Sequence, residues 1–212
     1  MPARLTSQDL EAATRALARR DYDLRCVVRR HGTPPLWGRR PGFATLVWII
    51  LEQQVSMTAA RTLFGRLRAA LGGAVTPESV NDAGVEGLRI TGLTRQKARY
   101  CLGLAQRVLD GSLDLHAVGR APEETARASL LRVPGIGPWT VDVYFLMALR
   151  RPDVWPRGDL ALAVAMREVK SLGAVPRHAE QLSLAATWAP WRSVAARILW
   201  MHYLARPRPA RL

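Results

Sequence analysis

The sequence has little cysteine, almost no lysine and no long apolar run, and each shortage excludes a class of protein. Cys26 and Cys101 are its only cysteines and lie far apart, so neither a disulfide framework nor a zinc site is expected. We expect two buried thiols in a reducing compartment. The longest apolar stretch, 43–51, is too short to span a bilayer, and the N-terminus carries no apolar signal core. These shortages indicate a soluble cytoplasmic protein.

Positive charge, in contrast, is abundant. The formal net charge is +14, and because Lys97 and Lys170 are the only lysines, nearly all of it comes from arginine. Such a charge favours a polyanionic partner, of which nucleic acid is the natural one. A GC-rich genome also produces sequences rich in Arg and Ala, so charge alone leaves both explanations open. A length of 212 residues suits one large domain or two small lobes.

Helix signals occur along the whole chain, and the alternation of apolar and polar residues that is typical of strands is missing. Predicted helix starts carry capping residues. They are Thr6 with Asp9, Thr76 with Pro77, Thr94, and Asp159. Glycines mark the predicted ends, at Gly72, Gly111 and Gly173. The sequence therefore predicts an all-α protein of about ten short helices.

Apolar spacing predicts which side of two of these helices is buried. In the helix that ends at Gly72, the inward residues are expected to be Leu63, Leu67 and Leu71. In the helix that starts at Thr94, they are expected to be Ala98, Leu102, Ala105 and Leu109.

The segment "LLRVPGIGPWTVDVY", residues 130–144, joins two apolar runs through a glycine-rich turn. Pro134 is expected to end the first helix, and Pro138 suits the first position of the second. Gly135 and Gly137 allow backbone conformations that a Cβ would forbid, and they let another chain approach closely. The N–H groups at the start of the second helix would then form an anion site suited to a DNA phosphate. An ordinary helical hairpin with a glycine turn fits the same pattern.

This segment resembles the hairpin of the helix-hairpin-helix DNA glycosylase superfamily, and "DVWPRGDLAL" resembles the segment of that superfamily that carries the catalytic Asp. The blocks "LVWIILEQQVSMTAARTL" and "WAPWRSVAARILW" are similar to its 3-methyladenine DNA glycosylase II, or AlkA-like, branch. The resemblance covers about Pro34 to Tyr203. It implies a two-lobed helical fold with a DNA-binding cleft between the lobes, without the N-terminal β domain of larger bacterial members. We expect one lobe at about 40–120, a catalytic lobe at about 121–205 that includes the hairpin and the N-terminal helices 1–39, and a basic tail at 206–212.

The resemblance implies a monofunctional DNA N-glycosylase that excises N3- or N7-methylated purines from duplex DNA in base excision repair. It makes Asp159 the catalytic residue, which would stabilise an oxocarbenium-like transition state and assist the attack of water. From its residue type alone, Asp159 is expected to be a helix N-cap, which does not exclude the catalytic role. Trp139 stands where strand-cutting members have a Schiff-base Lys, so no lyase activity is expected.

The resemblance also assigns a pocket for the flipped base. Trp139 and Trp200 match its two aromatic walls, although core packing also explains a tryptophan such as Trp200. We include Asp142, Val143 and Tyr144 among the substrate-binding residues. Val143 stands where a well-known member has a pocket Tyr, which leaves the substrate range open.

The expected DNA contacts lie in two segments. Gln53 and Gln54 fall in the stretch that probes the minor groove, and Gln54 takes the place of an intercalating Leu. A polar helix end explains Gln54 equally well. In the hairpin, the expected contacts are Gly135, Ile136, Gly137 and Thr140.

No cofactor is expected, because two cysteines cannot hold the iron–sulfur cluster of some relatives. By family resemblance, the carbonyls of Leu131, Val133 and Ile136 would hold a monovalent cation, Na⁺ or K⁺. The expected partner is duplex DNA containing damaged bases, bound by a monomer that does not associate with membranes. Three alternatives stay open: a non-catalytic module that binds damaged DNA, a glycosylase for deaminated or mismatched bases, and a helical protein–protein adaptor.

Overall fold

The computed structural model describes residues 3–206 and confirms the all-α prediction: every regular element among them is a helix. The described part of the chain forms twelve helices, two more than the approximate number expected. None of these helices is long and apolar enough to cross a membrane. The basic tail expected at 206–212 lies, apart from Arg206, outside the described residues.

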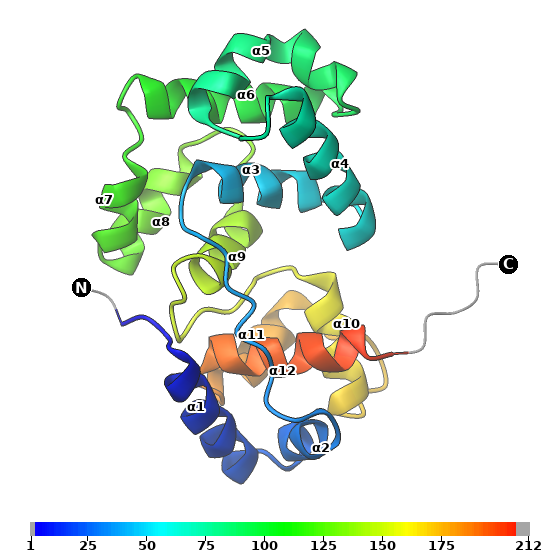
Figure 1. Ribbon diagram of the computed structural model, residues 1–212. Coiled ribbons are helices and arrows are strands. Elements are labelled where there is room, and N and C mark those ends of the chain that lie inside the picture. Colours follow the sequence, from blue (N-terminus) through cyan, green and yellow to red (C-terminus); the bar gives the residue numbers. More distant parts are fainter. Residues whose placement is uncertain (1–2, 207–212) are drawn as a thin grey trace, which may run out of the picture. The chain divides into compact units, whose positions relative to one another are not determined.

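The chain divides into two compact units, described here one at a time (Figure 1). Unit 1 contains Arg39–Leu149, and unit 2 contains Ala3–Gly38 together with the chain from Arg150 onward. This division groups the hairpin with the helices before it, whereas the sequence-based division had placed 121–149 with the catalytic lobe.

Unit 1 is built around one apolar helix. Its helices are α3 (Phe43–Glu52), α4 (Met57–Ala70), α5 (Pro77–Ile90), α6 (Arg95–Leu109), α7 (Leu115–Arg120), α8 (Glu123–Leu131) and α9 (Pro138–Met147). Helix α3 packs against α4, α6 and α9 (Figure 1). Because helices surround it, α3 is apolar on nearly every side, and Leu46, Ile49 and Ile50 are fully buried.

Unit 2 repeats this arrangement with a different central helix. Its helices are α1 (Ser7–Arg20), α2 (Tyr22–His31), α10 (Leu160–Val169), α11 (His178–Ala186) and α12 (Arg192–Leu204). Helix α12 packs against α1, α2, α10 and α11. Its residues from Ser193 to Trp200 are buried without a break, which a helix enclosed by four neighbours requires.

The predicted helix starts are confirmed. Thr6 and Asp9 form a capping box before α1, and Thr76 caps α5 with Pro77 at its first position. Thr94 caps α6, and Pro138 opens α9. Two expected ends are confirmed, because Gly72 and Gly111 directly follow the C-caps of α4 and α6 with left-handed backbones. Two others extend too far: α8 stops at Leu131 rather than Pro134, and α10 stops at Val169 rather than Gly173. Caps are local hydrogen bonds, so the sequence reveals helix starts more clearly than helix ends.

Part of the expected burial is wrong. In α6, Leu102 is only half-buried and Leu109 is exposed, while Cys101 and Leu104 join Ala98 and Ala105 on the buried side. In α4 and the residue after it, Leu67 is buried as expected, but Leu63 and Leu71 are half-buried.

The two cysteines also differ from expectation. Cys26 is exposed on α2, whereas Cys101 is buried, and burial raises the pKa of the Cys101 thiol to about 12. In a short helix, the apolar residues are compatible with several rotations of the helix about its axis. The packing of the neighbouring helices decides which side is buried.

Candidate nucleic-acid and catalytic site

The hairpin turn of unit 1 joins α8 to α9 through residues 132–137. The Val133 N–H donates to the Leu130 carbonyl at 3.0 Å, and the Ile136 N–H donates to the Val133 carbonyl at 3.0 Å. Gly135 has φ +86°, and a Cβ built there would overlap the ring of Tyr100, which comes from α6. The turn therefore requires glycine at position 135, for backbone conformation and for space.

The backbone conformation expected at Gly137 is wrong, whereas the close approach of another chain stays a prediction. The Gly137 φ of −92° and ψ of 177° are extended values that any residue adopts, and nothing lies within 4 Å of a Cβ built there. Its missing side chain instead leaves open space beside the first turn of α9. The first intrahelical hydrogen bond of α9 runs from the Val141 N–H to the Gly137 carbonyl. The first N–H groups of α9 point toward the positive end of the helix dipole, so this end of α9 is electropositive.

Other expected hairpin contacts lie inward. The side chains of Ile136 and Thr140 are buried, so the main chain of the turn is what Ile136 offers to a partner. Leu131 is exposed, and Val133 is buried while its carbonyl already accepts one N–H. A carbonyl oxygen has a second lone pair, so the donor set is compatible with a monovalent cation, which stays a prediction.

The end of α3 places the two predicted glutamines in different environments. Gln53 is half-buried, and its Nε2 donates to the Gly135 carbonyl at 2.9 Å and to Thr140 Oγ1 at 3.0 Å. Gln54 is exposed and has a left-handed backbone with φ +57°. The structure thus joins Gln53, Gly135 and Thr140 within unit 1, and it presents Gln54 to solvent.

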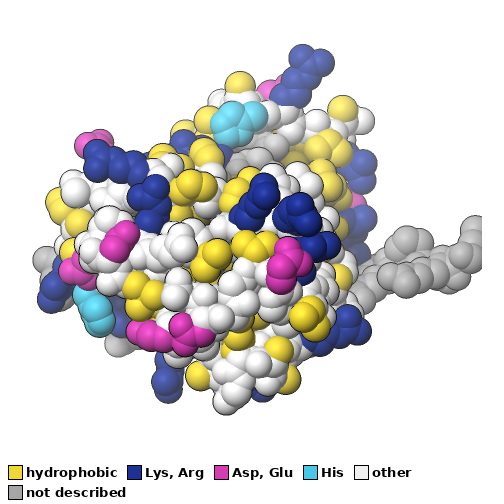
Figure 2. All heavy atoms as spheres, turned by 90° about the horizontal axis from the view of Figure 1, so that it is seen from above, with side chains coloured by type: hydrophobic (Ala, Val, Ile, Leu, Met, Phe, Trp, Pro, Cys, Tyr) yellow, Lys and Arg dark blue, Asp and Glu magenta, His cyan; other side chains and the backbone are white. Residues whose placement is uncertain are grey.

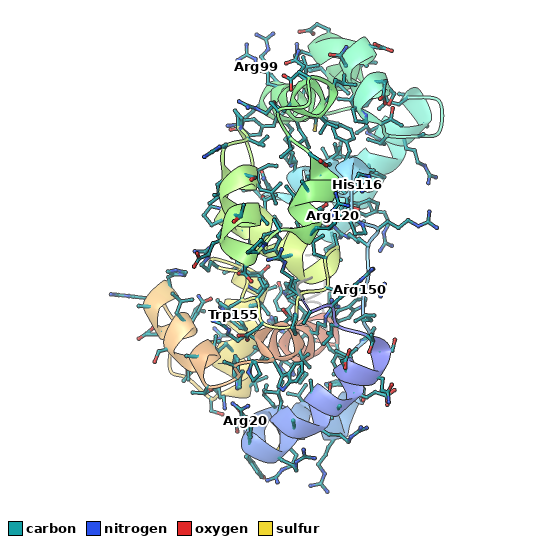
Figure 3. The ribbon with its side chains drawn as sticks, turned by 90° about the vertical axis from the view of Figure 1, so that its left-hand side faces the viewer. Arg20, Arg99, His116, Arg120, Arg150 and Trp155 are labelled. Atoms are coloured by element: carbon teal, nitrogen blue, oxygen red, sulfur yellow. The ribbon has the colours of Figure 1, made fainter. Side chains whose placement is uncertain are left out.

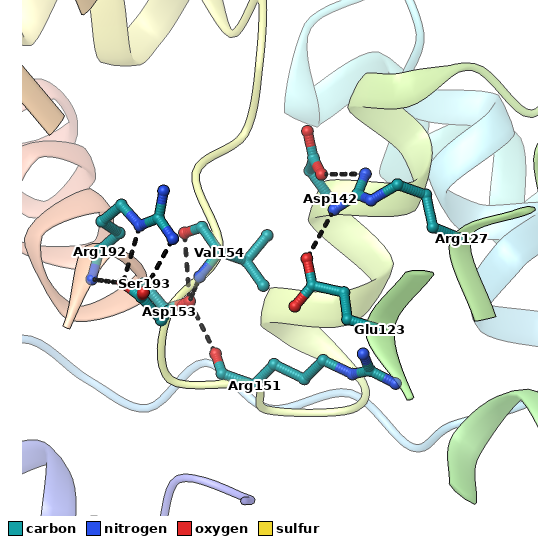
Figure 4. Close-up of polar contacts among 8 residues, drawn as sticks. All are labelled: Glu123, Arg127, Asp142, Arg151, Asp153, Val154, Arg192 and Ser193. Carbon is teal, nitrogen blue, oxygen red and sulfur yellow. Dashed lines mark hydrogen bonds and ion pairs between the residues drawn. The ribbon is translucent and has the colours of Figure 1, made fainter. Parts of the chain in front are cut away.

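Three expected substrate-binding residues are packed inside unit 1. The Asp142 carboxylate is 1% exposed and accepts from Arg127 Nη1 at 2.6 Å, and Arg127 also pairs with Glu123 (Figure 4). Val143 is buried. Tyr144 is fully buried, and its hydroxyl accepts from the Gly42 N–H at 3.0 Å. These contacts give Asp142 and Tyr144 partners within unit 1, and their role in substrate binding stays a prediction.

Asp159 in unit 2 is the N-cap of α10, as its residue type suggested. Gly158, with φ +77°, turns the chain into the cap. Asp159 Oδ1 accepts from the Leu162 N–H at 2.9 Å and from Trp200 Nε1 at 3.2 Å. The side chains of Asp159 and Trp200 are 8% and 9% exposed, so both lie at the edge of the core. The structure brings these two predicted residues together, and the N-terminus of α10 favours the negative charge.

The "PWR" motif anchors the segment that leads to Asp159. Arg192 donates to both Asp153 oxygens, from Nε and Nη2 at 2.8 Å each (Figure 4). The Ser193 hydroxyl donates to the Arg151 carbonyl at 2.7 Å and accepts from the Val154 N–H at 2.9 Å. Residues 151–154 are therefore fixed to the start of α12, which also carries Trp200.

Several positioning residues were missed by the sequence analysis. Lys97 Nζ donates to the carbonyls of Leu51 and Gln53, Tyr100 packs on Gly135, and Arg127 binds Asp142. One signal was available for Lys97, because it is one of only two lysines in an arginine-rich chain. The pairs that Arg127 makes with Glu123 and that Tyr100 makes with Gln96, each four residues apart on one helix, are local. Their contacts with Asp142 and Gly135 depend on other elements, and no local pattern marked them.

Surface charge by itself does not locate a binding face. The face in Figure 2 carries Lys and Arg side chains in several separate places with acidic side chains between them. Arg99 on α6 and Arg120 on α7 are among the exposed arginines of unit 1 (Figure 3). The glycine turn, the electropositive end of α9 and the capped Asp159 are the more specific features.

The all-helical fold, the glycine hairpin and the helix-capping Asp that follows it together define a narrow class of proteins. A family model identifies that class. Residues 47–192 match the model of the HhH-GPD superfamily of base excision DNA repair proteins. The chain belongs to this superfamily.

Curated proteins that the chain resembles carry the names of DNA repair enzymes. The chain is 36% identical to the "Probable bifunctional transcriptional activator/DNA repair enzyme AlkA" of Mycobacterium tuberculosis, over 91% of this chain and 39% of that protein. It is 26% identical to a DNA-3-methyladenine glycosylase of Bacillus subtilis, over 86% of this chain and 61% of that protein. The chain thus spans less than two thirds of the length of these curated relatives.

A solved structure gives the same picture. The Schizosaccharomyces pombe 3-methyladenine DNA glycosylase Mag1, in complex with abasic DNA, matches with a TM-score of 0.79 and 26% identity. The match covers 89% of this chain and 95% of Mag1. The fold class and the family expected from the sequence are therefore confirmed.

Proposed function

We propose that this protein is a monofunctional DNA N-glycosylase that releases N3- or N7-methylated purines from duplex DNA. Membership of the HhH-GPD superfamily and the names of its relatives, which include DNA-3-methyladenine glycosylases, support this proposal. The observation that carries it is Asp159, a carboxylate fixed through Oδ1 by the Leu162 N–H and the Trp200 indole.

The chemistry needs one anionic group beside the sugar. In a methylated purine that carries a positive charge, the bond between C1′ and N9 breaks with its electron pair moving to the base. The base leaves neutral, and positive charge develops on the sugar. A nearby carboxylate lowers the energy of that cation. Water then adds its oxygen to C1′, and the proton it loses is taken up by Asp159 before passing to solvent.

The base must leave the helical stack before this step. Trp139 on α9 is half-buried, and Trp200 on α12 keeps a small exposed fraction. We assign the Trp200 indole to the base, because an electron-rich ring attracts a cationic purine more than a neutral one. A role of Trp139 in base binding stays a prediction. In this proposal the Trp200 ring contacts the base while its N–H holds Asp159.

Strand cleavage by an amine is outside the proposal, because both lysines are committed elsewhere. Lys97 donates to two carbonyls at the end of α3. Lys170 donates to Asp21 and Asp23, and although its burial lowers its pKa, these carboxylates outweigh that and raise the pKa overall. Trp139 occupies the hairpin position where a Schiff-base lysine would be needed.

DNA contacts are assigned to unit 1. The electropositive end of α9 and the main chain at 135–137 suit a phosphate, since the space beside Gly137 is open. Exposed Gln54 suits the gap left by the flipped base, where its amide can hydrogen-bond to the orphaned partner base.

The decisive experiment is Asp159→Asn. Asn caps a helix as well as Asp does, so the fold is retained and only the charge is lost. We expect the release of 7-methylguanine from a duplex to fall by about 10²–10³ or more, while duplex binding is nearly unchanged. Gel analysis of the wild-type product should show an abasic strand that breaks only after alkali treatment.

The same assay separates the alternatives. Full activity of Asp159→Asn would refute the mechanism. A wild-type protein that binds methylated duplex but releases no base would be a damage-binding module. Release of hypoxanthine or mismatched thymine in preference to 7-methylguanine would point to a different substrate class.

A further inference from the structure

The loop after α3 is held by an unusual set of hydrogen bonds. The last carbonyls of a helix have no intrahelical donor, and here the Lys97 ammonium on α6 supplies one. Lys97 Nζ donates to the Leu51 carbonyl at 2.8 Å and to the Gln53 carbonyl at 2.9 Å. A positive charge at this end of α3 also complements the helix dipole. The main chain on both sides of Glu52 is therefore tied to α6.

The side chain of Gln53 fixes the same loop to the hairpin. Its amide nitrogen bridges the Gly135 carbonyl and Thr140 Oγ1, which belong to the turn and to α9. Gly135 is itself fixed by the Tyr100 ring, one helix turn after Lys97 on α6. Lys97, Gln53, Tyr100 and Gly135 thus connect α3, α6 and the hairpin in one network.

Gln54 follows Gln53 in the sequence, and this network leaves it exposed to solvent. Its left-handed backbone is unfavourable for a residue with a Cβ, so the surroundings must impose it. Val55 and Met57 beside it are exposed apolar side chains. An exposed, strained tip with apolar neighbours is suited to entering a base stack, provided that its backbone is rigid.

We infer that Lys97 is a positioning residue that, with Gln53, holds the Gln54 loop in its DNA-opening conformation before DNA binds. This inference rests on the proposed function, because it gives Gln54 its role in base flipping. The loop needs no ordering when it enters the duplex, which lowers the cost of flipping. Lysine suits the position because one ammonium nitrogen can donate to both the Leu51 and the Gln53 carbonyl. The N–H groups of a guanidinium lie in one plane and point in fixed directions.

The test compares Lys97→Met with Lys170→Met. Methionine keeps most of the side-chain length and removes the ammonium in both variants. Lys170 is the matched control, because it also donates to two groups but lies in unit 2 and binds Asp21 and Asp23. Lys97→Arg is the second variant, used if Lys97→Met unfolds, since it keeps the charge but changes the donor geometry.

The first measurement needs no DNA. Hydrogen exchange of the main-chain N–H groups at 53–57 should be at least about tenfold faster in Lys97→Met, while α12 exchanges as in the wild type. Lys170→Met should leave exchange at 53–57 unchanged. Unchanged exchange in Lys97→Met would overturn the inference whether or not the protein is a glycosylase.

The second measurement is single-turnover release of 7-methylguanine, paired with cytosine or placed opposite an abasic analogue. Lys97→Met should slow release about tenfold on the paired duplex and less than about threefold opposite the abasic site, where opening is already easy. Equal slowing on both substrates would show a general defect and overturn the inference. If the wild type releases no base at all, the proposed function fails, while the exchange result still decides the role of Lys97.

Discussion

The two units hold their predicted functional groups in different ways. In the hairpin of unit 1, backbone and neutral side-chain groups set the shape: Gln53 bridges Gly135 and Thr140, and Tyr100 packs on Gly135. In unit 2, one carboxylate is held by two N–H donors at a helix end. The hairpin of unit 1 should therefore be sensitive to added volume. Unit 2 should respond to changes that keep volume and remove a single polar group.

The largest effect beyond Asp159→Asn is expected for Gly135→Ala. The added Cβ would overlap the Tyr100 ring and require a left-handed alanine, so we expect a loss of about 2–5 kcal/mol of stability in unit 1. Urea denaturation followed by circular dichroism measures it.

Gly137→Ala is the matched control two residues away. Its backbone is extended and its surroundings are open, so the stability loss should stay below about 1 kcal/mol. Its DNA affinity should nevertheless fall, because the methyl group occupies the space assigned to a phosphate. Equal stability losses in the two alanine variants would contradict the account of the turn.

Trp200→Phe should have the next largest effect. Phenylalanine keeps an aromatic face and removes the N–H that donates to Asp159 Oδ1. We expect kcat for base release to fall by about 10–100-fold with a smaller change in KM.

Trp188→Phe is its control. Trp188 Nε1 donates to Asp21 Oδ2 at 2.7 Å, so the variant loses an indole–carboxylate bond in the same unit, away from Asp159. It should lose stability and keep its catalytic constants. A normal kcat in Trp200→Phe would show that the Trp200 N–H does not position Asp159.

The smallest expected effect is a pH dependence of stability that comes from Asp21. This carboxylate lies in unit 2 and has no predicted catalytic role. Burial alone would raise its pKa, but hydrogen bonds from Lys170, Trp188 and the Leu24 N–H outweigh it and lower the pKa below 3.8. The unfolded chain then binds more protons than the folded one near that pH. The stabilisation is complete above the unfolded pKa and disappears as the pH falls through the folded value.

Urea midpoints between about pH 5 and pH 2.5 measure this loss of stability. In Asp21→Asn, which does not titrate, stability should depend less on pH over that range. An identical pH dependence in both proteins would exclude Asp21 as the cause.

Local signals predicted much of the molecule. The capping residues before α1, α5, α6 and α10 were correct because a cap is a bond between neighbours in sequence. Burial was less accurate. Cys26 proved exposed, and the inner side of α6 was rotated toward Cys101 and Leu104. Those outcomes depend on which helices surround each segment.

The candidate site likewise contains features that the local sequence predicted and contacts that depend on tertiary packing. Asp159 was identified from its motif, and its cap was evident from the residue type. Its bond to Trp200, 41 residues later, was not evident, because it needs α10 and α12 to pack together. Gln53 was expected to meet DNA, yet the structure gives its side chain two partners within unit 1.

The sequence by itself determined the all-helical class, the helix starts, the glycine turn and the superfamily, because these depend on spacing and residue type along the chain. Only the tertiary structure decided that Lys97 holds the end of α3, that Tyr100 requires Gly135, and that the Trp200 indole holds Asp159. Each of these contacts joins residues about 35 to 46 positions apart. Packing brings such residues together, and no local pattern records which of them will meet.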